Sequence, residues 1–223
     1  MKRAVLLVSL FALCNLTLLA QTGKGPRAAH TTEKSKIHVA PQAAPAGLIK
    51  IFSNLGPNQF NLYTDNWYWY ITGPNVVGLP IKQQFVSMPF TPTSNARVSQ
   101  VRLALQYKGS GGDLFYVSIY GDSGGHPGTS LAGPVTLTDV PPFGTCCTLA
   151  VAKFDPPLPV TGGTTYWVVA STPTSGTGSD SSGAWDWVYQ DDIPPVWFSL
   201  LLGNFFDEPA YAASAFEVLG AND

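Results

Sequence analysis

Apolar and polar residues alternate with a period of two along much of this 223-residue chain, which is the pattern of strands that bury one face. The alternation is clearest over 101–107 (VRLALQY) and 115–120 (FYVSIY), where every second residue is apolar or aromatic. The glycine-rich segment KGSGGD at 108–113 separates the two runs. We therefore predict a central β-hairpin over 97–120, with this segment as its loop.

Shorter runs of the same kind predict further strands at 48–55, 67–71, 82–88, 130–138, 148–154, 164–171, 184–190, 196–202 and 213–219. At 67–71 the alternation puts Trp67, Trp69 and Ile71 on one face of a strand, and Tyr68 with Tyr70 on the other. Turn-forming segments separate the runs, among them Pro141-Pro142, Pro156-Pro157 and the polar stretch 171–183. About ten short strands with such turns predict an all-β fold, an antiparallel β-sandwich of the jelly-roll type.

The first 20 residues have the pattern of a secretory signal peptide. Lys2 and Arg3 precede an uncharged, mostly apolar run that ends at Ala20. Polar residues interrupt this run, and it is shorter than the roughly 20 apolar residues that a spanning helix needs. We expect cleavage before Gln21, secretion to the periplasm or the cell exterior, and no membrane-spanning segment in the mature protein. Residues 21–47 lack periodicity and predict a flexible basic linker before one β-sandwich domain at 48–223.

Charge divides the chain and excludes one class of partner. Residues 21–50 carry a net charge of +4, whereas residues 51–223 hold five basic and thirteen acidic residues, a net charge of −8. Phosphate contacts need clustered lysines and arginines, so an acidic domain with scattered bases is a poor nucleic-acid binder. We therefore expect no nucleic-acid partner.

Cleavage of the signal peptide would leave two cysteines, the adjacent residues Cys146 and Cys147. Exported proteins generally oxidise their thiols, but neighbouring cysteines close only a strained ring. Three alternatives stay open: a buried reduced pair, a vicinal disulfide, or a bond to another chain. The pair lacks C-x-x-C spacing, so it does not predict a metal site.

Several segments occur in the order found in bacterial exported sandwich domains. They are F-V-x-x-P-F from Phe85, V-x-x-V-x-L-x-L at 98–105, Y-V-S-I-Y-G-D-x-G-G-x-P-G at 116–128, G-T-T-Y-W-V-V at 163–169 and A-F-E-V-L-G at 215–220. Over about 83–220 the chain resembles the secreted jelly-roll domains of choice-of-anchor proteins and, more loosely, carbohydrate-binding jelly rolls. The resemblance implies a β-sandwich surface module without a known reaction.

The segment GDSGG at 121–125 matches the nucleophile loop of chymotrypsin-like serine proteases. In that role Ser123 would attack the substrate and His30 would serve as its base. His30, however, lies in the predicted linker, and about 100 residues follow Ser123, unlike in that family. Several glycines are also expected in a tight turn, because glycine adopts positive φ without steric cost. We interpret the match as accidental and predict no catalytic residue and no enzyme activity.

Carboxylates at predicted strand ends are candidates for a structural calcium ion, which takes hard oxygen ligands. The candidate ligands are Asp113, Asp122 and Asp139. The chain has no D-x-D-x-D-G run, and we expect no other cofactor. A glycosidase would need two carboxylates facing each other, and no motif marks such a pair.

Aromatic residues spaced by two are the remaining candidates for a binding site. Trp185, Trp187 and Tyr189 form one set, and Trp67 with Trp69 forms another. Exposed aromatic faces stack on sugar rings, whereas buried ones fill sandwich cores. We predict a secreted, non-catalytic module that binds a glycan or a cell-envelope partner through these residues. The alternatives are a structural extracellular or matrix protein without a small ligand, and a hydrolase.

Overall fold

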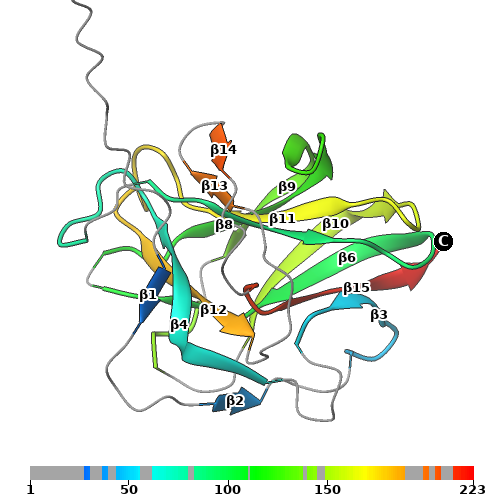
Figure 1. Ribbon diagram of the computed structural model, residues 1–223, viewed down its shortest axis with the longest axis horizontal. Helices are drawn as coiled ribbons and strands as arrows, with labels where there is room; N and C mark the ends of the chain where they lie inside the picture. The colour runs from blue at the N-terminus through cyan, green and yellow to red at the C-terminus, as the bar shows by residue number, and fades with distance from the viewer. Residues whose placement is uncertain are drawn as a thin grey trace, which may run out of the picture.

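The computed structural model describes residues 28–30, 37–39, 44–55, 62–79, 83–109, 111–137, 140–144, 149–188, 198–200, 204–206 and 213–223 (Figure 1). These residues form fifteen strands and no helix, which confirms the predicted all-β class. In chain order the strands are β1 (Ala28–His30), β2 (Ile37–Val39), β3 (Ile49–Ser53), β4 (Leu62–Thr72), β5 (Val86–Phe90), β6 (Ala96–Leu103), β7 (Leu105–Tyr107), β8 (Phe115–Asp122), β9 (Pro127–Leu137), β10 (Ala150–Val160), β11 (Tyr166–Ser171), β12 (Ser182–Val188), β13 (Phe198–Leu200), β14 (Asn204–Phe206) and β15 (Phe216–Asn222).

Two four-stranded sheets form the layers of a sandwich. The β6 sheet has the strand order β10-β6-β15-β3, and the β8 sheet has the order β5-β11-β8-β9. Strand β10 contacts β9 at one edge, and at the other edge the ring of Phe52 lies 6.1 Å from the ring of Phe90. Neighbouring strands within both sheets are antiparallel. The predicted antiparallel β-sandwich is therefore confirmed.

A third sheet, the β4 sheet, lies to the left of these layers in Figure 1. Its strand order is β1-β4-β12-β7, and β2 pairs with β4 as well. Its inner face contributes Trp69, Ile71 and Trp185 to the core, each of them fully buried. The two sandwich layers supply the other large core residues, including Leu103, Phe115, Ile119, Val168, Phe216 and Val218.

One stretch of chain links the β6 sheet to the β4 sheet. Strand β6 ends in the first sheet and β7 begins in the second, so the chain crosses between them at Ala104. The Ala104 amide donates to the Ala215 carbonyl at 3.0 Å, and the Ala104 carbonyl accepts from the Asp186 amide at 2.9 Å. Ala104 is thus bonded both to the segment that leads into β15 and to β12, which fixes the two sheets to each other.

The predicted hairpin over 97–120 is wrong in its pairing, although its strands are present. Strand β6 pairs with β10 and β15, β7 pairs with β12, and β8 pairs with β9 and β11. All three strands bury their apolar faces, with Leu103, Leu105 and Phe115 at 0% exposure. Alternation identifies the buried face of a strand but not the strand beside it. The chain therefore passes from the β4 sheet to the β8 sheet between β7 and β8.

The pair Pro156-Pro157, predicted to end a strand, lies inside β10. The pairing of β10 with β6 shifts register between Lys153 and Leu158, so the prolines occupy an irregularity in the ladder. Strand β10 is also an edge strand of its sheet. Proline is tolerated at edges and bulges, because no partner there requires its missing N–H.

The predicted linker at 21–47 contains two strands. Strands β1 and β2 both pair with β4, so these parts of the segment belong to a sheet and correct the prediction of a flexible arm. The predicted signal peptide at 1–20 lies outside the described residues. Within the part of the chain that the structure describes, no helix has the length and apolar character needed to cross a membrane.

Candidate functional site

Residues 178–182, at the start of β12, form the centre of the candidate site. They belong to the polar stretch that the sequence predicts as a loop, yet Ser179 and Ser181 are buried. Hydrogen bonds hold them to the end of β4: the Gly73 amide donates to the Ser181 carbonyl and the Asn75 amide to the Ser179 carbonyl, both at 2.9 Å. The Asn75 side chain also donates to Ser179 Oγ at 2.9 Å. This part of the stretch is therefore a bonded element of the fold.

The segment after β7 bonds to the opposite side of residues 178–182. The Lys108 amide donates to the Ser182 carbonyl at 2.6 Å, and Ser182 Oγ donates back to the Lys108 carbonyl. Further along, the Leu114 amide donates to Ser181 Oγ at 3.1 Å. Backbone and side-chain bonds together fix three segments that are far apart in the sequence.

Two glycines let these segments approach more closely than a side chain would permit. A Cβ atom at Gly73 would lie 2.1 Å from the Ser179 carbonyl oxygen, and one at Gly111 would lie 2.3 Å from the Asp180 carbonyl oxygen. Both neighbours are backbone atoms, which cannot rotate out of the way. Glycine is therefore required at these positions for close packing of the chain.

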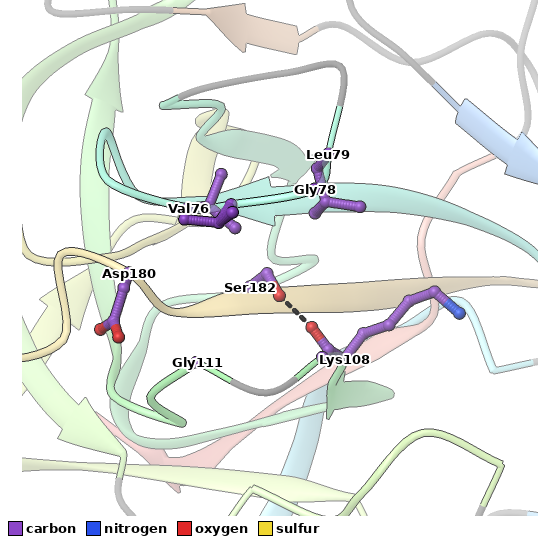
Figure 2. Close-up of a pocket in the computed structure, with 9 residues that line it drawn as sticks. Val76, Gly78, Leu79, Lys108, Gly111, Asp180 and Ser182 are labelled. Atoms are coloured by element: carbon purple, nitrogen blue, oxygen red, sulfur yellow. Dashed lines mark hydrogen bonds between the residues drawn. The ribbon is translucent and has the colours of Figure 1, made fainter.

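A cleft of about 460 Å³ opens between these segments (Figure 2). One wall is the loop after β4, with Val76, Val77 and Leu79, and the other includes Lys108, Gly109, Gly111, Asp180 and Ser182. The volume lies within the range of small-molecule sites, about 300–1,000 Å³. The cleft therefore joins an apolar wall to a polar one.

The two charged side chains of the cleft point in different directions. Figure 2 shows the Lys108 side chain extending away from Asp180. Lys108 Nζ lies 3.7 Å from the ring centroid of Phe143 and 5.3 Å from that of Tyr68, a cation–π arrangement. Asp180 is exposed, and none of the ion pairs between described residues includes it. The negative charge of the cleft is therefore separated from its positive charge.

A buried polar group lies on the outer face of the β4 sheet. Gln106 Nε2 donates to the Asp186 carboxylate, and Gln106 Oε1 accepts from the Gly144 amide at 2.7 Å. Tyr68 lies opposite Asp186 in the β4–β12 pair. Burial, together with the neighbouring Tyr70 and the Asp186 carboxylate, raises the pKa of Tyr68 well above its usual value. The sheet that carries the cleft is thus closed to solvent on both faces at this point.

A second cleft, of about 480 Å³, lies where the edges of the two sandwich layers meet. It is lined by residues 131–135 of β9 and 153–159 of β10, which are largely proline and aliphatic residues. Lys153 and Asp155 are its charged residues, and both are exposed. It lies between two edge strands, whereas hydrogen bonds among three segments fix the walls of the first cleft, so the first cleft is the better candidate.

The structure corrects the prediction of an exposed aromatic face at Trp69 and Trp185. These residues are partners in the β4–β12 register, and both have 0% exposure. The Trp185 indole N–H donates to the Ala215 carbonyl at 3.0 Å, so its polar atom is also bonded inside the protein. Neither ring can stack on a ligand from solvent. The side chains of Trp67 and Trp187, and all of Tyr189, lie outside the described residues.

The acidic residues predicted to bind calcium do not come together. Asp113 precedes β8 by two residues, Asp122 is its last residue, and both are exposed. The eight residues of β8 span about 23 Å. This separation corrects the prediction that they share one ion, and Asp139 lies outside the described residues. Among the described residues, no group of three or more His, Cys, Asp or Glu side chains could hold a metal ion. The cysteines Cys146 and Cys147 also lie outside that part of the chain.

The GDSGG segment forms the turn between β8 and β9, as its glycines predict. The Ser123 amide donates to the His126 carbonyl at 2.8 Å, and Gly124 and Gly125 both have positive φ, 68° and 89°. Asp122 holds the turn with both carboxylate oxygens, accepting from the Gly125 amide at 3.1 Å and from the Trp167 indole at 2.8 Å. His30, which would serve as the base in a serine protease, lies in the β4 sheet and not in this hairpin.

Sequence reasoning did not identify the residues of the first cleft. Val76, Val77 and Leu79 follow a strand without any periodic pattern, and Asp180 and Ser182 belong to the polar stretch. The one available signal was the number of glycines in 108–113 and 176–183, because glycine permits close approach of chain segments. No protein-family model matches the chain, and no curated protein is significantly similar to it.

Proposed function

We propose that the protein is a secreted, non-catalytic β-sandwich module that binds a glycan in the first cleft. The observation that carries this proposal is the division of the cleft into an apolar wall, with Val76 and Val77, and a polar wall, with Asp180 and Ser182. A sugar ring has the same division, since its faces carry C–H groups and its edge carries hydroxyls. A ring seated here would pack a face on Val77 and Leu79, because Val76 is buried beneath them, and would direct its hydroxyls to the polar wall.

The construction of the cleft supports a binding role. Its walls are fixed by backbone hydrogen bonds from Gly73 and Lys108 and by the close approach at Gly111. A preformed site loses little conformational entropy when a ligand binds. The signal-peptide pattern at 1–20 and the resemblance to secreted jelly-roll domains support a site that meets envelope or extracellular glycans.

The turn at 121–125 supports the non-catalytic part of the proposal. Asp122 uses both carboxylate oxygens to hold this turn, and the Ser123 amide closes it. The segment that matches a protease motif thus has a sufficient structural role. Such a module would bind its glycan without changing it chemically.

The test is a glycan-array screen of the purified protein, followed by calorimetric titration with the glycans that bind. Val77 is 91% exposed, so Val77→Ser removes apolar contact from the cleft wall without disturbing the core. Losing about 1 kcal/mol of apolar contact should weaken binding about fivefold. The matched control is Val151→Ser, because Val151 is exposed on β10, away from the cleft, and its affinity should equal that of the wild type.

Three outcomes contradict the proposal. Absence of binding to every glycan would favour the structural extracellular module. Equal loss of affinity in the Val77 and Val151 variants would place the binding site elsewhere. Shortened saccharides after incubation with the protein would identify a hydrolase.

A further inference from the structure

We infer that the first cleft selects saccharides that carry a free, protonated amino group. This inference rests on the proposed function and names its ligand class. It is carried by Asp180, which lines the cleft, is exposed, and belongs to none of the ion pairs among the described residues. A carboxylate in this situation is available to accept a charge-assisted hydrogen bond from an ammonium group.

The other charged side chain of the cleft does not neutralise Asp180. Lys108 extends away from it in Figure 2, and Lys108 Nζ lies over the rings of Phe143 and Tyr68. The aromatic faces attract the ammonium group and keep it at the far side of the site. The cleft therefore presents its negative charge to the ligand and holds its positive charge apart.

Glycine leaves the carboxylate uncovered. A Cβ atom at Gly112 would lie 3.3 Å from Asp180 Oδ1, so even the smallest side chain at this position would contact the carboxylate. With hydrogen in its place, no side chain at position 112 covers the Asp180 carboxylate. The surrounding domain carries a net charge of −8 over residues 51–223, which also favours a cation and disfavours an acidic sugar.

The test compares two probes that differ only at the amine, a glucosamine trimer and its fully N-acetylated form. Titration at low ionic strength and at a pH where the sugar amine is protonated should show about tenfold tighter binding of the free amine. Added salt should reduce this preference, because screening weakens an exposed charge pair. Raising the pH above the pKa of the sugar amine should abolish it.

The variant Asp180→Asn removes the charge and keeps the shape, so it should bind both trimers with similar affinity. Asp155→Asn is the matched control, because Asp155 is an exposed carboxylate of β10 in the second cleft, and it should keep the wild-type preference. Equal binding of both trimers by the wild type, or tighter binding of the acetylated trimer, would overturn this inference. Either result would still be consistent with the proposed glycan-binding function. Binding of neither trimer would also overturn it, and the array would then show separately whether the protein binds any glycan.

Discussion

Replacing Trp185 with alanine distinguishes a core tryptophan from a binding platform. Trp185 is fully buried beside Phe216, with ring centroids 5.9 Å apart. A tryptophan buries about 150–250 Å², which at about 25 cal/mol/Å² corresponds to roughly 4–6 kcal/mol. Measured truncations of buried Phe or Trp cost about 3–5 kcal/mol, and the hydrogen bond to Ala215 adds about 1 kcal/mol. We expect Trp185→Ala to lower the free energy of unfolding by about 4–5 kcal/mol.

Urea denaturation followed by circular dichroism measures this loss without relying on tryptophan fluorescence. Trp185→Phe keeps most of the apolar surface and loses the indole N–H, so its loss should be about 1–2 kcal/mol. Val77→Ala changes an exposed residue and should stay within about 0.5 kcal/mol of the wild type. A loss below about 1 kcal/mol for Trp185→Ala, with the m-value unchanged, would refute the core assignment.

Two further predictions concern buried polar groups. Folding raises the pKa of Tyr68, so the unfolded chain loses the Tyr68 proton at a lower pH than the folded protein does. The contribution of Tyr68 to the free energy of unfolding is therefore complete below about pH 10. Above that pH it falls by about 1.4 kcal/mol per pH unit. Tyr68→Phe should remove that slope in urea titrations at alkaline pH, and an unchanged slope would contradict the assignment. Glu217, fully buried, pairs with Arg102, so Glu217→Gln should cost about 3–5 kcal/mol, whereas loss of the exposed pair between Arg97 and Asp223 should cost under about 1 kcal/mol. A double-mutant cycle that finds no coupling between Arg102 and Glu217 would contradict this prediction.

The period-two pattern predicted most strands and their faces, because the polarity of each residue reflects whether its own side chain is buried. Trp69 and Ile71 are in the core, as one face of the 67–71 strand, and Tyr68, on the other face, packs against Phe143 with centroids 5.1 Å apart. Pairing was not predicted. The crossing at Ala104 depends on hydrogen bonds to residues more than 80 positions away. The local sequence pattern does not indicate such distant partners.

The candidate site was not predictable because its residues converge from three distant segments. The polar composition of 171–183 indicates a solvated loop, whereas Ser179 and Ser181 are buried through bonds to Gly73, Asn75 and Leu114. Serine is small enough to be buried once its hydrogen bonds are satisfied. The aromatic pairs were predicted to bind a ligand, because tryptophans spaced by two residues occur both in a core and on a surface.

The buried tryptophans of the β4 sheet also link the elements next to the cleft to the sandwich. The strands that carry the cleft, β4 and β12, supply Trp69 and Trp185 to the core that the sandwich layers share. Separation of β4 from β12 would expose the centre of the protein, so we expect these two strands to unfold together with the sandwich. Any ligand held in the cleft stabilises the entire domain by thermodynamic linkage, and its occupancy can be measured as a rise in melting temperature.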